Sequence, residues 1–552
     1  MSLKEYVVTL HNTVDLESFY EDIETPGGNL YIPNRAVPVH VRRPMSRNTH
    51  YMLTDVEAKQ LVDDPRVMAV ELSMEEQGIQ FRPVWTQTSS LWNKSSTLSS
   101  SYKNWGLLRV TEGKQRLNWG STATTTVSGS ITVTASGKNV DVVIVDGHVD
   151  PTHPEFAVDP SGSGGSRINQ YNWFLLNPEV TGGSAGTYVY PPYVDAAYPD
   201  NNLDGISDRT ADNDHGAHVA GIAVGNSQGW ARDANIYNIS PYSTTPSVTS
   251  FFIDYIRAWH RQKPVNPITG RKNPTITNHS YGIVNKVLIS SITSVRYQGV
   301  TTVAPLTAGQ LTNRGIYNDG TYVYMPGRAT LAFEQDYIDA MAEGIIFVGA
   351  AGNNGSLISE YNANVSDNYN NRVDVGGTFY YWNRGSISAI DGMLCVGAIG
   401  IAVEDFIWSL TERGPRVDVF APGRQIMSSV NSSVGTTVDD PRNSSYRVTK
   451  KTGTSMASPQ VCGILACLAE TWQNLSQSQA IEYIQRYSKE NQITASTGGF
   501  TDTTDLLGAP NRYLYFYKER PVSGQVGPKT NLNLRPTTGQ MWPRPHIYRY
   551  GK

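Results

Sequence analysis

Hydrophobic and polar positions follow an α/β pattern along most of the chain. From Trp105 to about Tyr517, short continuous apolar runs alternate with longer segments of helical periodicity. Continuous apolar strands are typical of a parallel sheet, because crossover helices cover both of its faces. The predicted strands are 140–145, 345–348, 394–399 and 417–420, and the predicted helices are 215–224, 249–261, 333–342, 455–472 and 478–487. We therefore expect a mostly parallel sheet with helices on both faces.

Residues 1–76 have the pattern of a separate, small α+β domain. Strand-like runs and helical patterns alternate in the order 6–10, 15–24, 50–53, 54–63 and 66–72. Thr54 and Glu57 have the spacing of a capping box, in which two side chains satisfy backbone N–H groups at a helix start. This domain precedes the segment 77–103, which is rich in Ser and Thr from Thr86 onward and which we predict to be an exposed linker of the kind that proteases cut.

The main domain is predicted over 104–517 and is interrupted by insertions rich in Gly, Tyr and Asn at 157–212, 299–330 and 356–390. A final segment, 518–552, carries five prolines and seven Lys or Arg against one acid. This composition favours an extended, solvated arm, and the alternative is a docking element for an assembly partner.

Composition excludes several classes of function. The net charge of −4 provides no global field for nucleic acid, and no apolar run reaches the length of a membrane span. The three cysteines lack metal-ligand spacing, and we expect no disulfide framework. The first twenty residues lack the apolar core of a signal peptide. We therefore expect a cytoplasmic location, or association with an assembled particle such as a virion, rather than Sec secretion.

Three polar residues, far apart in the sequence, form a candidate catalytic set. Asp146 ends the predicted strand 140–145, and functional groups collect at the carboxyl ends of parallel strands. His215 and Ser455 each lie near the start of a predicted helix, in the runs Asp-His-Gly-Ala-His-Val-Ala-Gly and Gly-Thr-Ser-Met-Ala-Ser-Pro. A serine hydroxyl becomes a nucleophile when an imidazole accepts its proton and a carboxylate orients the imidazole.

A fourth residue, Asn353, follows the predicted strand 345–348, and its amide could donate to an oxyanion beside the Ser455 backbone N–H. Taken singly, each residue has an ordinary alternative: Asp146 as a turn aspartate and Ser455 as a helix cap. His215 and His218 could suggest a metal, but neither a third ligand nor a glutamate base accompanies them.

The motifs around these residues resemble, in content and order, those of subtilisin-like serine proteases (subtilases). The resemblance covers roughly 104–517 and rests on the segments VVIVDGHVDPTHPEF, DHGAHVAG, NHSYG, FVGAAGNNG, LCVGAIG, VDVFAPG and GTSMASPQVCG. It implies a subtilisin-like fold and a serine endopeptidase that hydrolyses polypeptides through an acyl-enzyme. Asp146, His215 and Ser455 would be the triad, and Asn353 the oxyanion donor.

The resemblance also implies how substrate would bind. The segment Ser280, Tyr281 and Gly282 is similar to the strand that pairs with an extended peptide, a form of β-augmentation. The residues implied for the primary specificity pocket are Gly349, Ala350, Ala351 and Gly352. Two positions depart from the family pattern, Gly147 after the aspartate and Ala217 in the histidine motif, and neither makes or breaks a bond.

The N-terminal domain contains the segment YMLTDVEAKQLVDDPRVMAVELS, which resembles the end of subtilase propeptides. This resemblance implies that the domain assists the folding of its own protease and then inhibits it, so that the chain is made as a zymogen. The linker 77–103 would contain the maturation site, since Asn104-Trp105-Gly106-Leu107 is similar to the start of mature members.

A calcium loop is a further candidate, before His215. Oxygen-bearing side chains alternate as in an EF-hand loop, at Asp200, Asn202, Asp204 and Asp208, but the twelfth position is Ala211 rather than glutamate. Clusters of Asn, Asp and Gly also form plain turns. We expect no organic cofactor.

Three other functions fit parts of the sequence. A dinucleotide-binding fold would need a Gly-rich turn after the first strand, which Asp146-Gly147-His148 does not supply. An inactive subtilase fold could serve as a structural component of a larger assembly. A peptide ligase would use the same acyl-enzyme and an amine in place of water.

Overall fold

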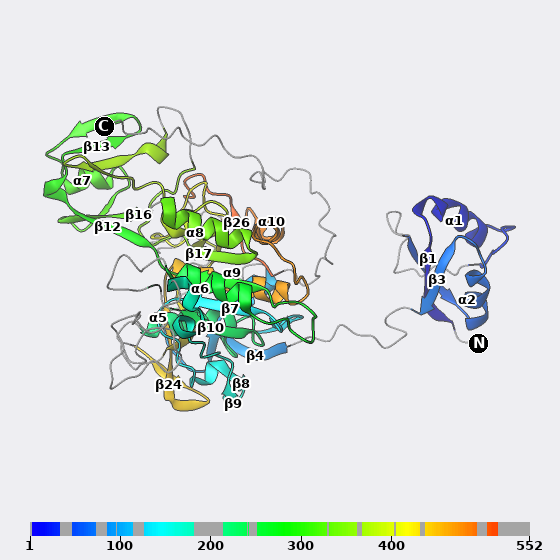
Figure 1. Ribbon diagram of the computed structural model, residues 1–552. Helices are drawn as coiled ribbons and strands as arrows, with labels where there is room; N and C mark the ends of the chain where they lie inside the picture. Colours follow the sequence, from blue (N-terminus) through cyan, green and yellow to red (C-terminus); the bar gives the residue numbers. More distant parts are fainter. Residues whose placement is uncertain are drawn as a thin grey trace. The chain divides into compact units, whose positions relative to one another are not determined.

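The chain forms two compact units, Met1–Pro83 and Val84–Lys552 (Figure 1). The computed structural model describes residues 3–33, 47–72, 85–94, 97–113, 126–181, 213–239, 241, 251–327, 331–360, 367–401, 405–430, 436–493 and 505–516. The proposed calcium ligands Asp200, Asn202, Asp204 and Asp208 and the C-terminal segment 518–552 lie outside these residues. Among the helices described, none combines the length and the apolar character needed to cross a membrane.

The first unit is the α+β domain expected from the sequence. Its antiparallel sheet has the order β2-β1-β3, and the side chains of both helices join the sheet in one core. Thr54 Oγ1 accepts from the Glu57 backbone N–H at 3.3 Å, and Glu57 Oε2 accepts from the Thr54 backbone N–H at 2.7 Å, which confirms the capping box. The elements are β1 (Lys4–Leu10), α1 (Leu16–Glu24), β2 (Asn48–Leu53), α2 (Asp55–Val62) and β3 (Val67–Leu72).

The second unit is built on an eight-stranded sheet of order β10-β7-β11-β17-β20-β21-β26-β25. Every neighbouring pair is parallel except β25 and β26, which confirms the mostly parallel sheet. The strands are β7 (Asp141–Val145), β10 (Asn235–Ile239), β11 (Thr275–His279), β17 (Ile345–Ala350), β20 (Leu394–Ile399), β21 (Val419–Pro422), β25 (Lys489–Glu490) and β26 (Arg512–Tyr513).

Helices cover this sheet on both faces, and successive side chains of β7 show how. Val142 and Ile144 pack in one core with α5 (Asn213–Val224) and α9 (Thr454–Ala469). Val143 and Val145 pack in a second core with α6 (Phe251–Gln262) and α8 (Leu331–Ala342). Because strand side chains alternate between faces, a continuous apolar run is needed to fill both cores. The first core also takes side chains from α3 (Trp105–Glu112) and α10 (Gln477–Tyr487).

Parts of the predicted insertions, together with residues 283–297 outside them, fold into antiparallel sheets (upper left in Figure 1). These sheets have a core of their own, which includes Trp382. From sequence, the insertions are recognised only as rich in Gly, Tyr and Asn, and these strands are not predicted. The elements are β12 (Ile283–Leu288), β13 (Ser294–Tyr297), β14 (Val300–Val303), α7 (Ala308–Thr312), β15 (Tyr317–Asn318), β16 (Tyr322–Gly327), β18 (Arg372–Val375) and β19 (Thr378–Tyr380).

The exposed linker predicted across 77–103 is wrong for two parts of that range. Residues Trp85–Asn93 form β4, which pairs with β6 (Thr126–Val133) and β5 (Tyr102–Asn104). Trp92 is fully buried, and its indole N–H donates to the Gly129 carbonyl at 3.2 Å. Threonine and tryptophan favour strands, so a polar stretch with well-spaced tryptophans can be an ordered strand rather than a linker.

A buried carboxylate, Glu155, ties the turn after α5 to a distant hairpin. Its two oxygens accept from the backbone N–H groups of Ser227 and Gln228 and from the Ser227 hydroxyl, at 2.9, 2.7 and 2.7 Å. The Arg442 guanidinium donates to the same carboxylate at 2.6 Å. Burial raises the pKa of Glu155, but the Arg442 charge and these hydrogen bonds outweigh burial and lower the pKa to about 2.

We expect Glu155→Gln to reduce the free energy of unfolding by about 3 kcal/mol at neutral pH, because the largely buried Arg442 cation loses one of its anionic partners. The folded pKa lies below the ordinary value of 4.5. The stabilisation is therefore complete above about pH 4.5 and is lost as the pH falls toward 2. Denaturant unfolding from pH 7 to 3 should show the gap between the wild type and the variant closing in that range.

The matched control is Glu490→Gln, which changes an exposed glutamate of β25. It should leave the free energy of unfolding within about 0.5 kcal/mol of the wild type. An equal effect of the two substitutions, or a gap that does not depend on pH, would contradict the role assigned to Glu155.

Candidate active site

Asp146 and His215, predicted as partners, are joined by a hydrogen bond. Asp146 follows β7 and is fully buried, and His215 is in the first turn of α5 with its side chain 35% exposed. The distance from His215 Nδ1 to Asp146 Oδ1 is 2.8 Å. An ionised carboxylate only accepts, so Nδ1 carries the proton and Nε2 is the nitrogen able to take another. The second oxygen, Asp146 Oδ2, has no partner among the described residues.

This contact depends on a close approach of α5 to the end of β7. A Cβ atom on Gly216 would lie 2.0 Å from the carbonyl oxygen of Gly147. No side chain fits in that space, because real Cβ contacts are not found below 3.0 Å. Gly216 therefore lets the helix begin against the strand end, with its neighbour His215 beside Asp146.

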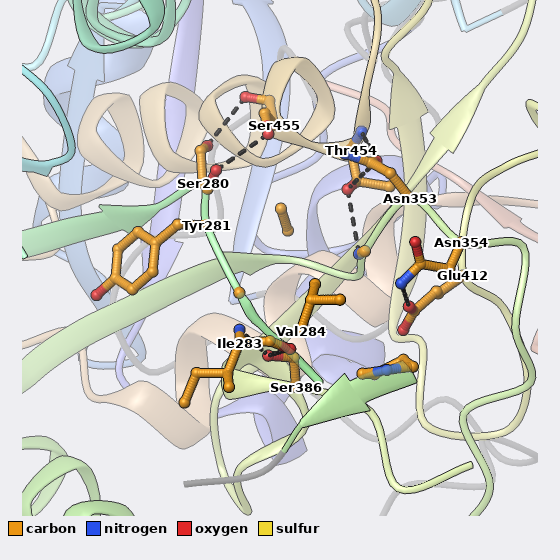
Figure 2. A pocket seen from close by; sticks show the side chains of 14 residues that line it. Ser280, Tyr281, Ile283, Val284, Asn353, Asn354, Ser386, Glu412, Thr454 and Ser455 are labelled. Carbon is orange, nitrogen blue, oxygen red and sulfur yellow. Dashed lines mark hydrogen bonds between the residues drawn. The ribbon is translucent and has the colours of Figure 1, made fainter. Parts of the chain in front are cut away.

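Ser455 is the second residue of α9 and is 7% exposed. Its hydroxyl donates to the Ser280 carbonyl at 3.0 Å, and the Ser280 hydroxyl donates to the Ser455 carbonyl at 2.9 Å (Figure 2). These reciprocal bonds hold the start of α9 against the residues that follow β11. In this side-chain conformation, the Ser455 hydroxyl donates to Ser280 rather than to His215. The complete Ser–His–Asp relay therefore stays a prediction.

Asn353 lies beside the start of α9, where Thr454 fixes its orientation. The backbone N–H and the hydroxyl of Thr454 both donate to Asn353 Oδ1, at 3.0 and 2.8 Å (Figure 2). A backbone N–H can only donate, so it determines which end of the amide is the oxygen. The Nδ2 group is thereby left as a donor on the pocket that Asn353 and Ser455 both line.

The pocket has a volume of about 130 Å³. Five of the residues implied for substrate binding line it: Ser280, Tyr281, Gly282, Ala350 and Gly352. Gly349 and Ala351 do not line it. Gly349 faces Met393 and Ser388, and Ala351 lies in the first core.

Sequence reasoning missed several lining residues: Ile283, Val284, Pro326, Asn354, Ser386, Glu412 and Thr454. Asn354 and Thr454 adjoin candidate residues in the same motifs, so proximity in sequence could have suggested them. Nothing in the sequence distinguishes Glu412 from other glutamates. It lies between β20 and β21, and only the fold brings it to the pocket.

The metal alternative for the histidine pair finds no support in the geometry. His218 is fully buried, and its Nε2 lies 3.2 Å from the Thr449 carbonyl oxygen. Burial holds the pKa of His218 well below its ordinary value, so the ring is neutral. The described residues contain no cluster of three His, Cys, Asp or Glu side chains that could hold a metal ion.

Comparison with known proteins identifies the family. The model of the subtilase family matches residues 137–506, which include all four candidate catalytic residues. The chain belongs to the subtilase family.

Individual subtilases are distant relatives. Subtilisin-like protease 8 of Arthroderma otae is 22% identical over 400 residues, which are 72% of this chain and 58% of that protein. Subtilisin DY of Bacillus licheniformis is 29% identical over 148 residues, 27% of this chain and 41% of that protein. The chain therefore spans about half the length of these two relatives. A solved cold-adapted subtilisin-like serine proteinase is 19% identical, with 77% of this chain and 100% of that chain covered and a TM-score of 0.44.

We expect Gly216→Ala to break the Asp146–His215 contact in this subtilase. The added methyl group forces α5 away from Gly147, and overpacking of this kind costs about 1–3 kcal/mol. Chemical denaturation should show that loss, and a crystal structure should show the Nδ1 to Oδ1 distance beyond hydrogen-bonding range.

Gly309→Ala in α7 is the control, since no atom lies within 4 Å of the added Cβ. It should cause no loss of stability, because alanine is the better helix former. A Gly216→Ala variant that retains the wild-type stability and distance would refute the steric argument.

Proposed function

We propose that the chain is a serine endopeptidase that hydrolyses peptide bonds and is made as a self-inhibited precursor. The observation that carries this proposal is the hydrogen bond between the buried Asp146 carboxylate and the partly exposed His215 ring. A serine at the start of α9 lines a pocket together with an oriented amide donor, Asn353. Membership of the subtilase family supports the same activity.

In the proposed reaction, the Ser455 hydroxyl turns from Ser280 toward His215 and attacks the peptide carbonyl carbon. His215 Nε2 accepts the hydroxyl proton and later donates it to the leaving amine. Asp146 holds the ring by its Nδ1 and stabilises the imidazolium charge. Water then attacks the acyl-enzyme, with His215 as the base, and regenerates the serine.

Two donors would stabilise the tetrahedral oxyanion. One is Asn353 Nδ2, which Thr454 orients by holding the other end of the amide. The other is the backbone N–H of Ser455, which belongs to the first turn of α9, where N–H groups have no partner within the helix. Both donors are in place before the charge develops, so little reorganisation is needed.

The substrate backbone would lie along Ser280–Gly282. The reciprocal bonds between Ser280 and Ser455 fix this segment next to the proposed nucleophile. An extended peptide that pairs with these residues presents its carbonyl to Ser455 whatever its sequence, and the pocket selects among side chains.

The N-terminal unit supports the zymogen part of the proposal. It has a core of its own, which is what a domain that inhibits and then leaves its protease requires. The maturation cut would lie on the N-terminal side of Trp85. A mature chain that began at Asn104 would lose β4 and the buried Trp92 from the catalytic unit.

The proteolytic proposal is tested by expressing the full chain beside its Ser455→Ala variant. The wild type should shorten, react with a fluorophosphonate and hydrolyse casein, and the variant should do none of these while keeping the same melting temperature. If the wild type is equally well folded but neither shortens nor takes the label, then the chain is an inactive subtilase fold with a structural role. Formation of new peptide bonds with added amines, faster than hydrolysis, would indicate a ligase.

A second variant, Asn353→Ala, tests the oxyanion donor. It should lower kcat by about 10²–10³-fold with KM nearly unchanged, the size of effect measured for such a donor in subtilisin. Labelled enzyme should be counted in both samples, so that loss of folded protein is not mistaken for loss of rate. An unchanged kcat would remove Asn353 from the mechanism.

The maturation site is tested by mass spectrometry of the shortened chain. We expect its first residue to lie on the N-terminal side of Trp85, because β4 belongs to the sheet with β6. A mature N-terminus at or near Asn104, with 85–103 absent from the purified enzyme, would contradict this assignment.

A further inference from the structure

A buried acidic residue, Glu412, lines the pocket next to Ser455. It lies between β20 and β21 and is 1% exposed. Its Oε1 accepts a long hydrogen bond of 3.5 Å from Asn354 Nδ2 (Figure 2). Its Oε2 has no hydrogen-bond partner among the described residues. The pocket therefore contains an acidic group with unused acceptor capacity.

The backbone leaves room for this group. Gly352 has a φ of +123°, and a Cβ there would lie 2.5 Å from the Glu412 carboxyl carbon and 2.6 and 2.8 Å from its two oxygens. A side chain at 352 would collide with the carboxyl group, because real Cβ contacts are not found below 3.0 Å. The Gly352 backbone N–H donates to Thr454 Oγ1 at 3.1 Å, so the wall beside Glu412 is fixed to the helix that carries Ser455.

No cation of the described residues compensates Glu412. The neighbouring Arg413 is directed elsewhere: its Nη1 donates to the Asp505 carbonyl at 3.1 Å and its Nη2 to the Ser409 carbonyl at 3.4 Å. Burial consequently raises the pKa of Glu412 well above its ordinary value, and the bond from Asn354 opposes this only in part. Isolated burial of an acid is costly, and the cost falls when a positive charge enters the site.

We propose that Glu412 selects substrates with lysine or arginine immediately before the scissile bond, the residue whose side chain enters this pocket. The proposal rests on the proposed proteolytic function and specifies its substrate class. A carboxylate in the specificity pocket is a general means by which serine proteases select cationic side chains. Lysine and arginine supply both a positive countercharge, which no described residue provides beside Glu412, and N–H donors for Oε2.

The remaining walls suit the stem of such a side chain. Val284, Pro326 and Ala350 place apolar surface along the pocket, while Glu412 supplies its acidic group. Long basic side chains bury their methylene groups against apolar surface and direct the charge to a polar end. A short polar or an acidic substrate residue would leave Glu412 without a cation.

The test measures kcat/KM of the mature enzyme on peptides that differ only in the residue before the cleaved bond: Arg, Lys, Gln, Leu, Phe and Glu. Rates are normalised to active serines counted with a fluorophosphonate. We expect Arg and Lys to exceed Leu, and Glu412→Gln to lower the Arg-to-Leu ratio by about 100-fold. Gln is isosteric, so the variant should fold with an equal or higher melting temperature.

Two further variants sharpen the result. Glu412→Asp keeps the charge and should retain a preference for the basic peptides, while Glu490→Gln, on exposed β25, should leave the Arg-to-Leu ratio unchanged. An enzyme that takes the label and cleaves Leu or Phe peptides as well as Arg peptides overturns the inference but not the proteolytic function. A full chain that takes no label overturns the proteolytic function itself.

Discussion

The site depends on one close contact, between the first turn of α5 and the peptide that follows β7. The carbonyl of Gly147 occupies the space where a side chain at position 216 would be. The helix therefore starts near enough for the His215 ring to reach a carboxylate that is wholly buried at the strand end. A longer separation would leave Asp146 buried without its imidazole, and a buried unpaired carboxylate is strongly unfavourable.

A second set of contacts aligns the other half of the site with the first. β7 and β11 are parallel neighbours in the sheet, so the residues after each strand emerge at the same edge. Asp146 follows β7, and Ser280 follows β11 and exchanges hydrogen bonds with Ser455. Asn353 follows β17, the next strand along, and is held by Thr454. Adjacent strand ends thus assemble groups that are more than 300 residues apart in the chain.

The sequence was sufficient for the features that depend on local pattern. Continuous apolar runs predicted the parallel strands β7, β17, β20 and β21, but not β10 and β11, where polar residues interrupt the apolar pattern. The spacing of Thr54 and Glu57 predicted the capping box. The prediction failed for β4, because its two tryptophans stand in a run of mostly polar residues without a continuous apolar pattern. It also missed Glu412, since one charged residue in a loop carries no periodic signal. Its burial becomes apparent only when Gly352 and Asn354 are folded against it.

The burial of α9 determines when, during unfolding, the candidate active site comes apart. All sixteen residues of this helix are buried, including Ser455 and its neighbours. A helix that is buried along its whole length has little surface from which to fray, so the amide hydrogens beyond its first turn exchange with solvent only when the surrounding domain opens. Ser455, the proposed nucleophile, should accordingly keep its place until cooperative unfolding, and partial melting of outlying hairpins would leave it undisturbed.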